Sequence, residues 1–170
     1  MQGIADLLVS HDADAIALQE FAPAHCDGLI AGLEEAGYRM FYPEGYSKET
    51  DFRMTAVTIL AVKEGVSFDQ EYRAEIELSY RYIAGSLKKD KEEKIKIFAP
   101  HIPTLGEKAS TATMKRKCDM LYVARKYFEE CSIIKRQKCI LMGDLNSEVR
   151  EAKISNLCGD EMEFAQLKEF

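Results

Sequence analysis

Short apolar segments that end on polar residues alternate along this chain with segments of helical periodicity, and this alternation restricts the fold more than any other feature. Runs rich in apolar and strand-forming residues predict strands at 15–20, 38–43, 54–62 and 138–144, the first and last of them buried. Apolar residues at three- and four-residue steps predict helices at 2–10, 24–36 and 109–131. Strands that alternate with covering helices indicate a mixed α/β layered fold.

The middle of the chain adds strands that follow one another without a helix between them. The sequence predicts these strands at 71–79, 80–87 and 94–103, after a polar loop at 43–53. In the long helix at 109–131, a mostly apolar stripe is formed by Met114, Cys118, Leu121, Tyr122, Arg125 and Phe128. The hairpin-like strands and this long helix complete the expected layers.

Length and composition describe an ordinary globular chain. Its 170 residues suffice for one packed core, so we expect a single domain over 1–170. No apolar run reaches the roughly 18 residues that a membrane-spanning helix needs, and the first residues lack the pattern of a signal peptide. We therefore expect a cytoplasmic protein whose five cysteines, none in a CxxC motif, are reduced. The net charge of −6 argues against a general polyanion-binding surface.

Four polar side chains stand where apolar strands end. Glu20 closes one strand, His101 follows another in "FAPHIP", and Asp144 follows a third in "CILMGDLN". Asn146 lies two residues after Asp144, so on an extended segment both side chains point the same way. In layered α/β folds, ligands usually bind at the carboxyl ends of the strands. Two carboxylates there suit Mg²⁺ or Mn²⁺, an amide can contact a metal or a phosphate, and a histidine can donate to developing charge or move a proton.

Each of these residues also has an ordinary explanation. Glu20 alone could be a solvated carboxylate, "GDLN" a turn, and His101 a packing residue at a rim. The functional interpretation depends on all of them occurring together, each at a strand end. Basic residues are similarly open to two interpretations: the "KRK" segment at 115–117, Arg73 and Arg81 are solvated or contact a phosphate, with solvation favoured. The loop at 43–53, with Tyr46, Lys48 and Arg53, is by its position the segment expected to face a substrate.

Three segments resemble the endonuclease/exonuclease/phosphatase superfamily. "DADAIALQE" resembles the family segment that ends in LQE, "KIFAPHIP" the strand that leads to a pocket histidine, and "CILMGDLNSE" the GDFN motif, with Leu145 where phenylalanine is commoner. The resemblance covers nearly the whole chain. It implies a layered α/β/β/α sandwich of two mixed sheets with outer helices. It also implies Mg²⁺- or Mn²⁺-dependent cleavage of a phosphodiester or phosphomonoester by in-line attack of water.

The resemblance also assigns a role to each matching residue. Glu20 corresponds to a metal ligand, and Asp144 orients or activates the attacking water close to the metal, so these two form the expected metal site. Asn146 positions the phosphate and the Asp144 carboxylate. His101 binds the phosphate and stabilises the transition state. The expected partner is a phosphate-ester substrate, with nucleic acid among the candidates.

Two family features have no match in this chain. The family begins with a strand that carries a metal-binding Asn, and it ends with an Asp and an "SDH" triplet whose His is the general base; here the remaining histidines are His11 and His25. The chain therefore looks truncated at both ends, and we expect exposed sheet edges that favour a homodimer.

Three functional hypotheses follow from this comparison. The first is a phosphohydrolase of the family type. The second is a catalytically impaired, truncated relative that acts as a binding or assembly module, because the general-base motif is absent from the sequence. The third, a purely structural domain, would leave the placement of four polar residues at strand ends as a coincidence.

Overall fold

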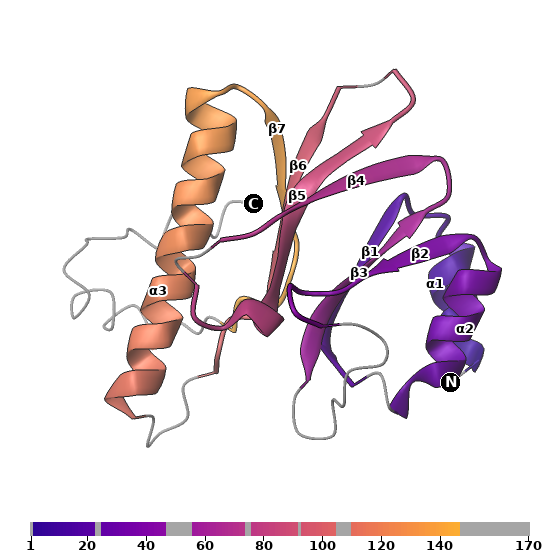
Figure 1. Cartoon of the computed structure of the whole chain (residues 1–170), viewed down its shortest axis with the longest axis horizontal. Helices are drawn as coiled ribbons and strands as arrows, with labels where there is room; N and C mark the ends of the chain where they lie inside the picture. Colours follow the sequence, from indigo (N-terminus) through magenta and orange to yellow (C-terminus); the bar gives the residue numbers. More distant parts are fainter. Residues whose placement is uncertain are drawn as a thin grey trace.

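Two β-sheets lie face to face between two outer layers of helix (Figure 1). The computed structural model describes residues 2–22, 25–46, 56–73, 76–91, 93–104 and 110–146. Helices α1 (Gln2–Ser10) and α2 (Asp27–Glu35) cover one side. On the other side lies α3 (Thr111–Phe128), which continues into the π-helical turn η3 (Glu129–Ile134). This arrangement confirms the predicted α/β sandwich with outer helices.

The first sheet has three strands in the order β1-β3-β2. They are β1 (Ala15–Phe21), β2 (Tyr38–Phe41) and β3 (Val57–Lys63), and β3 pairs antiparallel with both neighbours. The register of β1 on β3 shifts between Leu18 and Phe21, so the end of β1, which carries Glu20, is irregular. Among the described residues this sheet contains antiparallel pairs alone.

The second sheet has four strands in the order β4-β5-β6-β7. They are β4 (Val66–Glu71), β5 (Tyr82–Lys89), β6 (Ile95–Pro100) and β7 (Lys138–Leu141), and the short 3₁₀ turn η2 (Ser79–Arg81) leads into β5. Pairing is antiparallel except between β6 and β7, which run parallel, so the predicted mixed pairing is found in this sheet. Because β6 and β7 are parallel, the residues that follow each of them meet at one edge.

Both faces of strand β3 are buried, one against helices α1 and α2 and the other against the second sheet. Val57, Ile59 and Ala61 pack toward α1 and α2, whereas Leu60 and Val62 pack against the second sheet. Alternate residues of a strand point to opposite faces, so an unbroken apolar run is what a strand between two layers requires. The sequence of β3 therefore accounts for its central position.

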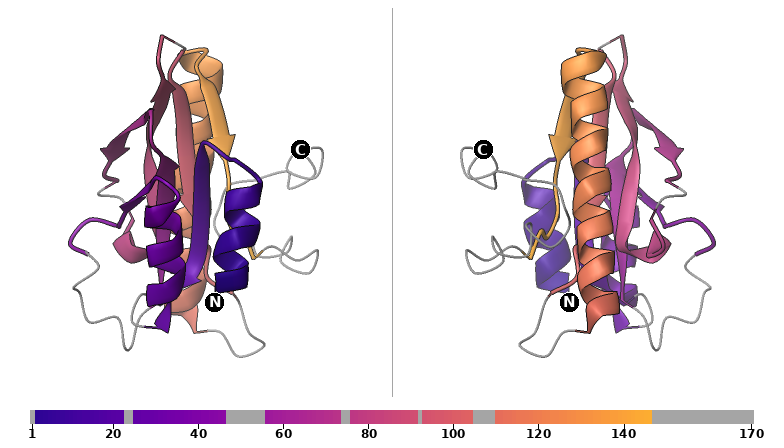
Figure 2. Two further views of the ribbon diagram at one scale, coloured as in Figure 1. Left: turned by 90° about the vertical axis from the view of Figure 1, so that its right-hand side faces the viewer. Right: turned by 90° about the vertical axis from the view of Figure 1, so that its left-hand side faces the viewer.

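Helix α3 lies along the outer face of the second sheet, beside β7 (Figure 2). Its buried face consists of Lys117, Met120, Val123, Ala124 and Tyr127. The predicted helix is present, but the mostly apolar stripe from Met114 to Phe128 is not its buried face, and Tyr122 from that stripe is exposed. A second stripe, offset from the first around the helix, is therefore the one that packs against the sheet.

Two predicted strands also differ from the structure. The prediction at 71–79 is wrong: strand β4 ends at Glu71 and the preceding residues from Val66 form it instead. The strand at 138–144 is present as β7 but is not buried, since exposed and half-buried residues alternate along it and Ile140 is 44% exposed. In the described part of the chain β7 has a strand on one side only, which explains the alternation.

Cysteine chemistry and helix length complete the description. Cys26, Cys131 and Cys139 carry free thiols as expected, whereas Cys118 is disulfide-bonded, so the expectation of a reduced thiol is wrong there. None of the helices described here combines enough length with enough apolar character to cross a membrane. Residues 47–53 of the predicted loop, with Lys48 and Arg53, lie outside the described residues.

Candidate active site

The structure brings the four sequence-predicted residues together at one end of the sandwich. Glu20 comes from the first sheet, and its Oε1 lies 3.5 Å from Nε2 of His101 in the second sheet. His101 follows β6 and forms a parallel bridge with Asp144, which follows β7. Asn146 Nδ2 donates to the carbonyl oxygen of Ile102 at 2.8 Å. The site therefore spans both sheets.

Glu20 reaches the second sheet from an unusual backbone position. Its φ is +51°, a left-handed conformation that non-glycine residues seldom adopt, and it lies in the irregular end of β1. Its side chain is 72% exposed, so the carboxylate faces solvent as well as His101. Strained backbone of this kind is enriched at functional sites, and here it places a carboxylate at the rim of the site.

The "GDLN" segment is held by hydrogen bonds to the strand beside it. Met142 N donates to Phe98 O at 3.0 Å, and Ile102 N donates to Asp144 O at 2.8 Å. Within the segment, Asn146 N donates to Asp144 Oδ1 at 2.9 Å, which closes an Asx turn. The turn that the ordinary interpretation predicted is present, and it also presents Asp144 at the end of the sheet.

The backbone at Gly143 passes so close to the backbone of Pro100 that only glycine fits there. A Cβ at Gly143 would lie 2.1 Å from the carbonyl oxygen of Pro100, a distance that no side chain tolerates. The glycine therefore lets the chain after β7 pass directly beside the chain after β6. That passage brings Asp144 next to His101.

His101 has one defined tautomer in this environment. The residue is 2% exposed, and its Nδ1 lies 3.3 Å from Nη1 of Arg81. A guanidinium can only donate, so Nδ1 accepts and the neutral ring carries its proton on Nε2, the nitrogen that faces Glu20. Burial lowers the pKa of His101 below its usual value, and the charge of Arg81 lowers it further, against the opposing effects of Glu20 and Asp144. The ring is therefore a neutral donor at neutral pH.

Arg81 belongs to the site, although the sequence favoured a solvated role for it. Its guanidinium contacts His101, and its Nε is buried without a hydrogen-bond partner within the described ranges. Its backbone carbonyl accepts from His101 N at 2.7 Å. A buried, unsatisfied charged donor is costly unless a further acceptor, such as an anion, completes it. The register that pairs Tyr82 with Pro100 sets Arg81 opposite His101, and that register was not readable from the sequence.

Two other basic residues have structural surroundings that the sequence did not indicate. Arg73 packs on the ring of Tyr127, 4.6 Å from its centroid, and lies 3.9 Å from Glu130, so its guanidinium is held by contacts within the fold. In the segment 115–117, Lys115 is exposed as expected. Lys117 is instead 2% exposed and donates from Nζ to Asn146 O at 2.6 Å.

The donor set at this end was compared with the needs of a divalent metal. Among the described residues there is no group of three or more His, Cys, Asp or Glu side chains that could hold a metal. Glu20 and Asp144 nevertheless supply hard carboxylate oxygens next to His101, Glu20 through its side-chain contact and Asp144 as the bridge partner of His101. Mg²⁺ is commonly bound by one or two carboxylates and several waters, so the chemistry of these two residues fits that ion.

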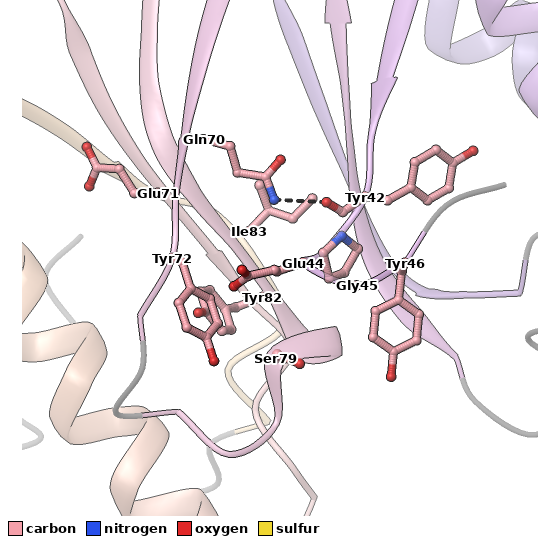
Figure 3. Close-up of a pocket in the computed structure, with 11 residues that line it drawn as sticks. Tyr42, Glu44, Gly45, Tyr46, Gln70, Glu71, Tyr72, Ser79, Tyr82 and Ile83 are labelled. Atoms are coloured by element: carbon pink, nitrogen blue, oxygen red, sulfur yellow. Dashed lines mark hydrogen bonds between the residues drawn. The ribbon is translucent and has the colours of Figure 1, made fainter. Parts of the chain in front are cut away.

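A pocket of about 390 Å³ opens at the same end of the second sheet (Figure 3). It lies where β4 ends and β5 begins, next to η2, which also carries Arg81. Among the described residues its lining contains four tyrosines and two glutamates and no lysine or arginine: Tyr42, Pro43, Glu44, Gly45, Tyr46, Gln70, Glu71, Tyr72, Ser79, Tyr82 and Ile83.

The side chains that face this pocket offer acceptors rather than positive charge. Glu44 and Gln70 extend toward its middle, and Gln70 Nε2 donates to Tyr42 O at 2.8 Å. Glu71 turns away and pairs with Lys96. The described side chains thus offer acceptors for a group that carries hydrogen-bond donors.

Comparisons with known proteins identify the fold. No protein-family model and no curated protein matches the chain. Among solved structures, TDP2 from C. elegans matches with a TM-score of 0.63 and 15% identity over 88% of this chain and 43% of that one. A mannosyl-6-phosphatase from Bacteroides thetaiotaomicron matches with a TM-score of 0.62 and 16% identity, over 93% and 60%. ANGEL2, a 2′,3′-cyclic phosphatase, matches with 0.54 and 20%, over 91% and 45%.

The chain has the fold of the endonuclease/exonuclease/phosphatase superfamily. The resemblance found in three sequence segments is therefore confirmed at the level of the fold. The chain spans about half the length of these matched structures, from 43% to 60%. At 15–20% identity the match establishes the architecture, and the activity is argued from the site.

Proposed function

We propose that the chain is a metal-dependent phosphohydrolase that cleaves a phosphate ester by attack of water. One observation carries the proposal: Glu20 on one sheet and Arg81, His101, Asp144 and Asn146 on the other converge at one end of the sandwich. The Nε of Arg81 is buried without a hydrogen-bond partner among the described residues, beside the buried His101, and an anion bound there would complete it.

His101 and Arg81 bind the phosphate in this proposal. The Nε2 proton of His101 points toward the Glu20 carboxylate at the rim of the site, and a phosphate oxygen bound beside Glu20 can accept it. Arg81 supplies positive charge directly behind the ring and holds Nδ1 as an acceptor. The two groups therefore stabilise negative charge that develops on the phosphoryl oxygens.

Asp144 and Asn146 act on the attacking water and on the phosphate. The Asp144 carboxylate keeps one oxygen on Asn146 N, so its orientation is fixed and the other oxygen can accept a proton from water. Glu20 and Asp144 are the residues that would hold Mg²⁺ or Mn²⁺. When bound, that ion supplies Lewis-acid activation of the phosphate ester.

The organic part of the substrate lies in the pocket beside η2. Its described lining, with Glu44 at the middle, offers acceptors to a group rich in hydroxyl or amino donors. Nucleic acid stays among the candidate substrates because its bases and sugars carry amino and hydroxyl donors. Glu44→Gln should therefore raise KM for a nucleotide ester by about five- to tenfold, and an unchanged KM would exclude the pocket from substrate binding.

A binding or assembly module that does not hydrolyse its ligand is the second candidate. The observation that favours it is that the described residues contain no cluster of three metal-binding side chains. Such a module would bind phosphate esters through His101 and Arg81 without turnover. Cytoplasmic localisation, a single domain over 1–170 and a homodimer stay predictions in both cases.

The test is hydrolysis of bis-p-nitrophenyl phosphate and of plasmid DNA, with Mg²⁺ or Mn²⁺ and with EDTA. We expect metal-dependent turnover that falls by about 10²- to 10⁴-fold in Asp144→Ala. Asp119→Ala, which removes an exposed carboxylate from α3, is the matched control and should keep full activity. A folded wild-type chain that binds inorganic phosphate but shows no turnover would support the binding module instead.

A further inference from the structure

Lys117 is a charged residue buried under the candidate site. It lies on the face of α3 that packs against the second sheet, and only 2% of its surface is exposed. A buried ammonium is stable only when hydrogen bonds replace the water that it loses. Its neighbours Lys115 and Arg116 are exposed and pair with Asp119 and Glu77, so burial is particular to Lys117 within this basic segment.

The ammonium group donates to the backbone of the "GDLN" segment. Lys117 Nζ lies 2.6 Å from the carbonyl oxygen of Asn146, across 29 residues of sequence. Asn146 has a φ of +44°, so its backbone is left-handed. Asparagine tolerates this conformation better than most residues but does not prefer it, and a strong acceptor contact at its carbonyl stabilises it.

Three contacts fix Asn146 and each goes to a different partner. Its backbone N–H donates to Asp144 Oδ1, its side-chain Nδ2 donates to Ile102 O, and its carbonyl accepts from Lys117. The first contact orients the Asp144 carboxylate. A change in the Asn146 backbone therefore moves both side chains that act on the phosphate and the water.

We propose that Lys117 is a positioning residue that holds Asn146 left-handed and thereby sets the orientation of the Asp144 carboxylate. This inference rests on the proposed phosphohydrolase function for its kinetic consequence. Its structural consequence does not, since the contact with Asn146 constrains the segment whether or not the chain turns over a substrate. Lys117 acts through the backbone of Asn146 and does not touch the reacting atoms.

The test compares Lys117→Met with the matched control Lys115→Met, which removes an exposed lysine from the same helix. We expect Lys117→Met to lower kcat by about 10- to 100-fold with KM within threefold, as for other residues that support a catalytic group. Lys117→Arg, which keeps a buried cationic donor, should recover most of that loss. Lys115→Met should leave both constants unchanged.

Backbone hydrogen exchange gives a readout that is independent of activity. In Lys117→Met the amide of Asn146, which is bonded to Asp144 Oδ1, should exchange at least tenfold faster, while amides of β3 and β5 keep their protection. If Lys117→Met does not fold, Lys117→Gln is measured in the same way. An unchanged Asn146 exchange rate and an unchanged kcat in a folded variant would overturn the inference. A wild-type chain without turnover would contradict the proposed function, and the exchange rates would then decide on Lys117 alone.

Discussion

At this end of the sandwich, the role of a single residue depends on which other segments its side chain contacts. Gly143, Glu20 and Asn146 were conspicuous in the sequence because they stand at strand ends, and the structure adds the physical reason for each position. Arg81 and Lys117 were not distinguishable from solvated cations, because nothing in a local pattern shows that a basic side chain is buried against another segment. Residue-level inference from sequence therefore found the acids and the histidine but missed the cations that support them.

Gly143→Ala should destabilise the chain by about 1–3 kcal/mol, because the new methyl group meets the backbone of Pro100 and the "GDLN" segment must shift. Gly28→Ala is the control: its Cβ meets nothing within 4 Å and alanine favours the helix, so stability should hold or rise. Urea unfolding measures both. Equal stability of the two variants would show that the backbones of Gly143 and Pro100 do not lie in close contact.

His101 should make the stability depend on pH in the mildly acidic range. Its pKa in the folded chain is lowered from the ordinary value of 6.5, so below that pH the unfolded chain binds the proton first. The free energy of unfolding therefore falls as pH drops from 7.5 to 5.5, by up to about 1.4 kcal/mol from this group. Urea unfolding of wild type and His101→Asn at both pH values isolates the contribution, with His11→Asn as the exposed control. If wild type and His101→Asn lose equal stability, burial does not lower the His101 pKa.

Elements were predictable where periodicity was unambiguous. Helices α1 and α2 and strands β1, β3 and β6 lie where the sequence placed them, because each has a single apolar face or an unbroken apolar run. The sequence failed at β4, where alternating Val66 and Phe68 lie next to a polar turn, and at the orientation of α3. Along α3 the helical pattern was present, but a second stripe ran beside the first, and tertiary packing decided between them.

The buried face of α3 can be tested by truncation. Met120 is 1% exposed against the second sheet, so Met120→Ala should cost about 2–4 kcal/mol. Met114 belongs to the other stripe and is only half-buried, so Met114→Ala should cost less than about 1 kcal/mol. Thermal or urea unfolding gives both values. A larger loss of stability in Met114→Ala than in Met120→Ala would mean that the stripe from Met114 to Phe128 is the buried face.

At the scale of the whole molecule, β7 is one of the strands that lie at a sheet edge among the described residues. In the described residues this strand pairs with β6 alone, and Ile140 on it is 44% exposed. An open strand edge with an exposed apolar residue favours pairing with another chain. The expected homodimer through a sheet edge has its physical basis here.

Self-association should therefore increase with concentration and depend on this edge. Light scattering after size exclusion should show a dimer that Ile140→Lys abolishes, because a charge at the edge prevents close approach of a second strand. Ile4→Lys changes an equally exposed isoleucine on α1 and should leave the dimer intact. A monomer at every concentration would contradict the prediction.

In the proposed function, residues from two sheets form one site for phosphate-ester hydrolysis. Its most direct test is metal-dependent kcat/KM for bis-p-nitrophenyl phosphate, measured for wild type, Glu20→Gln, His101→Asn and the double variant. Residues that act as a unit are non-additive, so the double variant should lose little more than the more damaging single one. Full activity in either single variant, or losses that multiply in the double variant, would mean that Glu20 and His101 do not share a site.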